Sequence, residues 1–142
     1  AADRLDAAGH RTAVTCIVEP GRFRLPRDER ERAFVAGDAA LEPLFPAAAT
    51  ARVIVSHMRP EPTLGVLRRV DTGPRRTRAL GYVARGGTLD VAGMLFANRC
   101  TWAHVAAEAA SALGIDAAQV LRSDEWAAVR GLGDPHTVMT SE

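Results

Sequence analysis

The chain has 142 residues, of which 47% are hydrophobic and 25% are charged, and its formal net charge is +1. This composition is that of one globular domain with enough residues to bury a core, and it excludes a largely disordered chain. No apolar run reaches the ~18 residues that a membrane span needs, so we expect a cytoplasmic protein without a membrane partner.

The first half of the chain alternates helical and strand-like patterns. Residues 1–8 predict an amphipathic helix, and residues 12–18 (TAVTCIV) predict a strand buried on both faces. A charged loop with a polar helical turn is expected over residues 19–32, followed by a short helix over residues 39–45 that Asp38 caps. The β-branched run at residues 51–57 (ARVIVSH) then predicts a second buried strand.

The pattern continues in the second half. Pro60 and Pro62 are expected to form a loop before a helix over residues 63–70. Residues 78–83 (RALGYV) predict a third strand. Thr88 is a suitable N-cap, so the next helix is expected to begin there and to end near residue 98.

The chain after residue 100 is expected to be helical. Thr101 should cap a helix that Gly114 ends, with His104 and Glu108 paired on its exposed face. The apolar face of this helix is expected to contain Trp102, Val105, Ala106, Ala109 and Leu113. One more helix is expected over residues 115–131.

This order of elements predicts the fold class. Strands that alternate with helices, and that are apolar throughout rather than alternating, are typical of an α/β/α three-layer sandwich with a mostly parallel sheet. We therefore expect residues 1–131 to form the domain and residues 132–142 to form a flexible tail.

The two cysteines, Cys16 and Cys100, lie in apolar contexts and lack the paired spacing of metal ligands. Buried free thiols are therefore favoured over a disulfide or a metal site. No HExxH, GxSxG or cysteine–histidine ligand pattern occurs, so the residues themselves define no catalytic set and no metal site.

A possible phosphate-binding turn follows the third predicted strand, at Gly86, Gly87 and Thr88. Glycines let a ligand approach the backbone, and a helix start presents free N–H groups to an anion. Neither GxGxxG nor GxxxxGK[ST] is present, which argues against a nucleotide fingerprint. Two interpretations stay open: a tight strand-to-helix connection, or a seat for an anion or a neighbouring domain.

Six arginines lie close together in sequence, with Asp71 as the only acidic residue among them. They are Arg68, Arg69, Arg75, Arg76, Arg78 and Arg85. Such a cluster could bind phosphate or an acidic protein surface, or it could be a solvated loop. Nucleic acid is not an expected partner, because aromatic residues for base stacking are not interleaved with the cluster.

His57 ends the second predicted strand, at the sheet edge where α/β proteins place their ligands. This position makes His57 the best single candidate for a polar role, although a hydrogen-bonded histidine at a strand end is the commoner outcome.

A spaced set of residues begins at His57: a proline three positions later, an arginine pair closing the next helix, then GY, a Gly/Thr-rich turn, methionine, asparagine and histidine. The set is His57, Pro60, Arg68, Arg69, Gly81, Tyr82, Gly86, Thr88, Met94, Asn98 and His104. This segment resembles the C-terminal domain of phosphoketolases, thiamine-diphosphate enzymes related to transketolase. Departures at Arg59 and Gly93 identify a divergent relative.

The resemblance implies a role in a larger enzyme. In this family the diphosphate and Mg²⁺ of the cofactor are held by other domains, and the C-terminal domain mainly supports the dimer. We therefore expect a structural domain or small subunit, without catalytic residues, of an enzyme that cleaves ketose phosphates or transfers their two-carbon unit. His57, Arg68, Arg69 and the turn at residues 86–88 would face partner domains or an anion. The alternative is a stand-alone, non-catalytic anion-binding or regulatory module of the same fold.

Overall fold

The computed structural model describes residues 1–83 and 87–140. Its α-helices are α1 (Ala2–Ala7), α2 (Glu29–Arg32), α3 (Asp38–Leu44), α4 (Pro60–Val66), α5 (Val91–Ala97), α6 (Trp102–Leu113), α7 (Ser123–Val129) and α8 (His136–Met139). Short 3₁₀ helices are η1 (Pro20–Phe23), η2 (Arg68–Val70) and η3 (Ala117–Gln119). The strands are β1 (Arg52–Ser56) and β2 (Thr77–Gly81).

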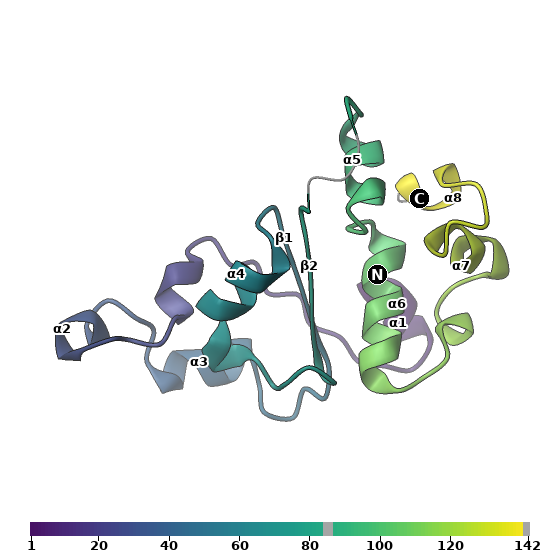
Figure 1. The fold of residues 1–142 in the computed structure, drawn as a ribbon. Coiled ribbons are helices and arrows are strands. Elements are labelled where there is room, and N and C mark those ends of the chain that lie inside the picture. Colours follow the sequence, from purple (N-terminus) through teal and green to yellow (C-terminus); the bar gives the residue numbers. More distant parts are fainter. Residues whose placement is uncertain (84–86, 141–142) are drawn as a thin grey trace.

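The strands β1 and β2 pair in parallel, with Arg52 opposite Thr77 and Ser56 opposite Gly81. The helix α4 lies in the connection between the strands and contacts β2, while α6 contacts both strands. Figure 1 shows α4 and α6 on different sides of the pair. The predicted mixture of helices with parallel strands is confirmed, and the sheet has two strands within the described residues.

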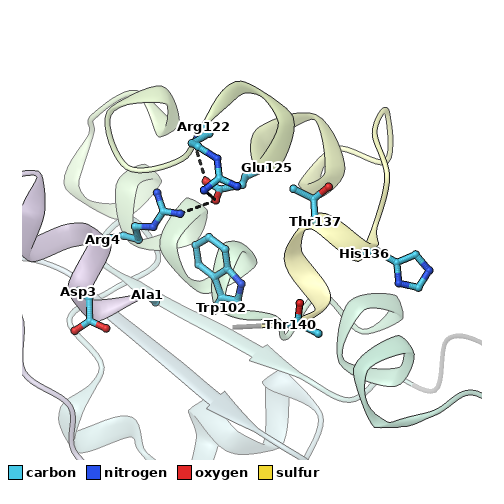
Figure 2. A pocket seen from close by; sticks show the side chains of 9 residues that line it. All are labelled: Ala1, Asp3, Arg4, Trp102, Arg122, Glu125, His136, Thr137 and Thr140. Carbon is cyan, nitrogen blue, oxygen red and sulfur yellow. Dashed lines mark hydrogen bonds and ion pairs between the residues drawn. The ribbon is translucent and has the colours of Figure 1, made fainter. Parts of the chain in front are cut away.

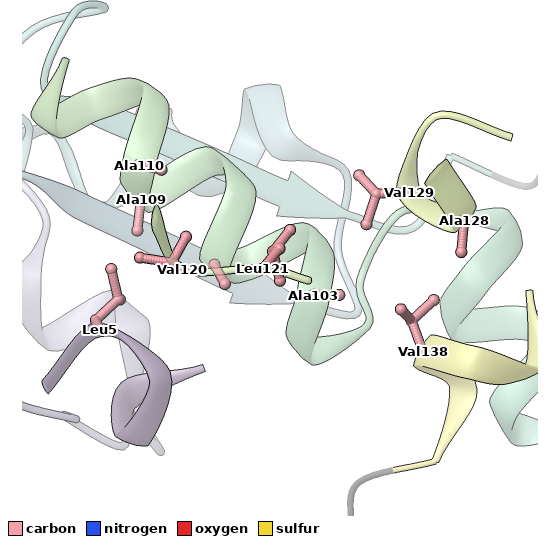
Figure 3. Packing of buried hydrophobic residues seen from close by; sticks show 10 residues of the cluster. Leu5, Ala103, Ala109, Ala110, Val120, Leu121, Ala128, Val129 and Val138 are labelled. Atoms are coloured by element: carbon pink, nitrogen blue, oxygen red, sulfur yellow. The ribbon is translucent and has the colours of Figure 1, made fainter. Parts of the chain in front are cut away.

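The hydrophobic core lies around α6 in the C-terminal half (Figure 3). Its buried residues are Leu5, Ala103, Ala106, Ala109, Ala110, Val120, Leu121, Ala128, Val129 and Val138. Half of them are alanine, and short side chains let neighbouring backbones approach closely. The predicted burial of Ala106 and Ala109 is confirmed, and Gly114 ends α6 in the left-handed conformation at φ 74°.

The N-terminal half is open, in the sense that its side chains are less buried than those of the C-terminal half. No residue from 6 to 62, all of them described, is buried. The strand predicted at residues 12–18 does not form: Val14 and Val18 are 84% and 86% exposed, and the segment joins neither β1 nor β2. β-Branched residues favour extended backbone, but a strand also needs a neighbour for its N–H and C=O groups. The segment has side-chain contacts instead, from Thr12 to Asp6 and from Thr15 to the Leu44 carbonyl.

Two predicted helix starts were wrong by several residues. Pro60 is the first residue of α4 and Pro62 lies in its first turn, because a proline's missing N–H is not needed there. The helix α5 begins at Val91 rather than at Thr88, since the carboxylate of Asp90 accepts the Gly93 N–H at 2.7 Å and caps it.

The C-terminal segment also differs from the prediction. Residues 115–131 form η3 and α7 rather than one helix, and Arg122 is extended at the N-cap of α7. The residues expected to be a flexible tail include α8, which contacts α5, α6 and α7. Val138 of α8 is fully buried, so the apolar side chain holds this segment on the domain.

Gly81 is the residue at which β2 approaches the turn after β1. A Cβ at this position would overlap the Met58 carbonyl oxygen and lie 3.2 Å from the ring of Pro60. We expect Gly81→Ala to lower the free energy of unfolding by about 2 kcal/mol, because backbone must move to admit the methyl group. Gly65→Ala is the control: it meets nothing within 4 Å inside α4 and should be neutral or stabilising by up to ~1 kcal/mol. Urea denaturation of both variants measures this, and equal stabilities would contradict the close approach.

The two thiols differ in exposure. Both are free, as predicted, but Cys16 is exposed because its segment is outside the core. Cys100 is partly buried, its Sγ lies 3.3 Å from the Asn98 carbonyl oxygen, and burial raises the pKa of its thiol. We expect a thiol reagent at neutral pH to modify Cys16 before Cys100. Mass spectrometry of Cys16→Ser and Cys100→Ser proteins over time checks this order, and faster labelling of Cys100 would contradict it.

Candidate functional site

The carboxyl ends of β1 and β2 form the sheet edge at which a ligand was predicted. His57 follows β1 directly, is exposed, and has no hydrogen-bond or ion-pair partner among the described residues. Beside it, the Oγ atoms of Ser56 and Thr63 lie 3.0 Å apart, and Thr63 also donates to the Arg59 carbonyl. His57 is therefore available to solvent or to a partner rather than engaged in the fold.

The turn after β2 is held by Asn98. Its Oδ1 accepts the Val83 N–H at 2.9 Å, and its Nδ2 donates to the Met94 carbonyl at 2.9 Å. Asn98 is buried, so both hydrogen bonds are partly shielded from water. The side chain joins the end of β2 to α5, which gives Asn98 a structural role at this edge.

The predicted phosphate-binding turn is only partly described. Gly86 and Arg85 lie outside the described residues. Gly87 and Thr88 are exposed, and the Asp90 carboxylate occupies the start of α5 where an anion at Thr88 would need free N–H groups. A negatively charged side chain at that helix start opposes an anion. Within the described part of this turn, no contact therefore supports the stand-alone anion-binding alternative.

The arginine cluster divides into two kinds of residue. Arg69 donates to the Ala36 carbonyl and pairs with Asp38 at 2.7 Å, and Arg78 pairs with Glu108 at 3.4 Å. The remaining described members are exposed and have no side-chain partner among the described residues: Arg68, Arg75 and Arg76.

Arg75 and Arg76 do not form one site with His57. Arg75 and Arg76 precede β2, whereas His57 follows β1. Because the strands are parallel, Arg75 and Arg76 lie at the amino ends of the strands and His57 at the carboxyl ends, separated by the length of a strand.

His104 is a buried part of α6 rather than a surface partner of Glu108. Only 3% of the residue is exposed, its Nδ1 lies 2.8 Å from the Thr101 hydroxyl, and its ring meets Phe96 edge-on. Burial, with a smaller effect of Arg99, lowers the pKa of His104 to about 4. The predicted pair was wrong: Glu108 instead contacts Arg78 and Arg99.

A cavity of about 510 Å³ lies among α1, α6, α7 and α8 (Figure 2). It is lined by Ala1, Asp3, Arg4, Trp102, Arg122, Glu125, His136, Thr137 and Thr140. Glu125 is 1% exposed, and its carboxylate receives Arg4 at 2.6 Å and Arg122 at 2.7 Å. The indole nitrogen of Trp102 is buried without a hydrogen-bond partner.

Sequence reasoning missed this cavity. Arg4 and Glu125 are separated by 121 positions, and no spacing rule connects residues so far apart. The helix repeat predicts that Trp102 lies on the apolar face of its helix, but it gives no information about the partner of the indole N–H group. The burial of Glu125 marks the cavity, and that burial is visible only in the structure.

The described residues contain no group of three or more His, Cys, Asp or Glu side chains that could hold a metal ion. In the same part of the chain, none of the helices is both long and apolar enough to cross a membrane. The chain matches no family model, and neither the curated proteins nor the solved structures include a significant match.

The buried His104 predicts how stability changes with pH. Its folded-state pKa of about 4 is below the ordinary value of 6.5, so the unfolded chain binds this proton first as the pH falls. The free energy of unfolding should therefore decrease between pH 6.5 and 4, by up to about 3 kcal/mol. Urea denaturation across this range should show a smaller decrease for His104→Gln. The exposed-site control, His57→Gln, should keep the wild-type decrease, and an unchanged decrease in His104→Gln would contradict the assignment.

Proposed function

We propose that this chain is the C-terminal assembly domain, or a small subunit, of a phosphoketolase-type thiamine-diphosphate enzyme. The enzyme would act on ketose phosphates, by cleavage or transfer of a two-carbon unit. Its catalytic domains would be the partners of this chain within an oligomer. One observation carries the proposal: the residues that resemble the family include those on which the connection between β2, α5 and α6 depends.

Four members of the resembling set illustrate this. Gly81 and Pro60 meet where β2 passes the turn after β1, and only a glycine fits there. Asn98 bonds both the chain after β2 and the last turn of α5, and His104 is buried against Thr101. Residues under such steric and hydrogen-bonding constraints support an inherited structural motif rather than a catalytic one.

The open N-terminal half supports an assembly role. Large apolar side chains are exposed there: Val14, Val18, Leu25, Phe34, Leu44 and Val55. The strands β1 and β2 each have a neighbour on one side only within the described residues. Apolar surface and unpaired strand edges gain free energy when another chain covers them. We propose that association completes the three-layer α/β/α sandwich.

Cofactor binding is assigned to the partner domains in this proposal. Magnesium with a diphosphate needs oxygen ligands such as clustered carboxylates, and the described residues provide no such group. His57, with the exposed Arg68 and the apolar side chains Val14 and Val18, would instead contribute contact surface. Arg69 is held by Asp38 and Ala36 and would act through the fold.

Reconstitution tests the proposal. The chain is mixed with a phosphoketolase that has been truncated before its C-terminal domain, and ketose-phosphate turnover and co-elution are measured. We expect the chain to restore turnover to the truncated enzyme and to have none alone. Failure to co-elute together with failure to restore turnover, or turnover by the isolated chain, would overturn the proposal.

A charged substitution in the apolar surface locates the interface. Val18→Asp should weaken association at least about tenfold, because burying an unpaired carboxylate costs more than the ~1.4 kcal/mol that a tenfold change represents. Leu132→Asp is the matched control, since Leu132 is exposed in the C-terminal half. Equal effects of the two variants on the dissociation constant would argue against an N-terminal interface.

A further inference from the structure

We propose that the cavity among α1, α6, α7 and α8 binds a small organic acid through a single oxyanion group, a carboxylate or a phosphate. An oxygen of this group would accept the hydrogen bond of the Trp102 indole N–H. Nothing in the proposed assembly role requires such a site, so the two proposals are independent.

The unpaired indole N–H is the first observation. Trp102 Nε1 is shielded from solvent and has no hydrogen-bond partner. Leaving a buried donor unpaired costs about 1–3 kcal/mol, so native proteins rarely retain one without a partner. Figure 2 shows the indole in the middle of the side chains that line the cavity. An acceptor atom within hydrogen-bond distance of this nitrogen would remove this cost.

The second observation is that donors remain in the cavity after the buried carboxylate of Glu125 is used. Both oxygens of Glu125 are occupied, Oε1 by the guanidinium groups of Arg4 and Arg122 and Oε2 by the Arg122 backbone N–H. Arg4 uses only Nη2 in this contact, and its guanidinium also stacks over the Trp102 ring at 5.2 Å. Its Nε and Nη1 groups remain available beside the indole N–H.

The far wall adds two further donors. The hydroxyl groups of Thr137 and Thr140 have no partner among the described residues, and both line the cavity. Asp3 and His136 also line the cavity, and because both are exposed, solvent screens the negative charge of the Asp3 carboxylate. Neutral hydroxyls, an indole and a partly used guanidinium are complementary to an acceptor-rich anion.

The volume agrees with a small organic ligand rather than with one water molecule. A cavity of about 510 Å³ lies within the range of about 300–1,000 Å³ that is usual for small-molecule sites. The helices α1, α6, α7 and α8 form its walls. The elements that form the core therefore also set the shape of the cavity.

The indole N–H signal in a ¹H–¹⁵N spectrum tests the proposal directly. Acetate, inorganic phosphate and neutral acetamide are titrated into the full chain, at constant ionic strength and pH. We expect the Trp102 signal to shift with acetate or phosphate, and the stronger of the two identifies the oxyanion. Trp126 is an internal reference, because it too stacks against an arginine, Arg130, but does not line the cavity. No saturable shift with either anion, or an equal shift with acetamide, would overturn the proposal.

Two substitutions then separate binding from folding, with affinity measured by calorimetry. Trp102→Phe keeps a ring but removes the unpaired donor, so it should weaken binding of the anion about tenfold. Its ligand-free melting temperature reports separately the packing lost against the core and Arg4. Arg4→Lys keeps a cation for Glu125 but removes the Nε and Nη1 donors, so it should weaken binding about tenfold or more. The control Arg130→Lys, at the other tryptophan, should leave the affinity unchanged. Unaltered affinity in folded Trp102→Phe protein would show that the anion binds elsewhere and would overturn the proposal.

Discussion

The C-terminal half depends on the interactions of one buried group, the carboxylate of Glu125. It receives one guanidinium from α1 and another from the N-cap of α7, and its second oxygen accepts the Arg122 N–H. A buried charge is tolerated only when it is paired and hydrogen-bonded. Loss of either arginine should therefore destabilise the fold. This contact joins the first helix to one that lies 121 positions later and sets one wall of the cavity.

The alanine-rich packing around α6 makes this polar contact more important. Ala103, Ala106 and Ala110 are fully buried, yet each contributes little apolar area. A core of short side chains yields less hydrophobic free energy than one of leucine and phenylalanine. Longer-range specificity must then come from directional contacts, such as Glu125 with Arg4 and the hydrogen bonds of Asn98.

Local patterns predicted the elements that depend on nearby residues. The β-branched run before His57 and the run ending at Gly81 became β1 and β2, and Gly114 ended α6 because glycine readily adopts positive φ. The failures have a common cause. Residues 12–18 have strand propensity but no partner strand, and the burial of His104 depends on Thr101 and Phe96. Propensity describes one segment, whereas pairing and burial depend on several.

The candidate sites show the same limit more strongly. Arginines that are adjacent in sequence have different contacts: Arg69 forms an ion pair with Asp38, while Arg68 is exposed. The cavity at Trp102 depends on segments from both ends of the chain, and no short motif marks it. The pattern of the sequence does not show why a glycine stands at position 81, whereas the close approach of Met58 explains it.

The contrast between the two halves connects the fold to its proposed role. The C-terminal half has buried apolar residues, a paired internal charge and a capped α5, whereas residues 6–62 have no buried member. If the exposed Val14 and Val18 served no partner, they would promote nonspecific association without stabilising the monomer. The proposed assembly role predicts this arrangement, because another chain would bury the open apolar surface while the core of the C-terminal half stays formed.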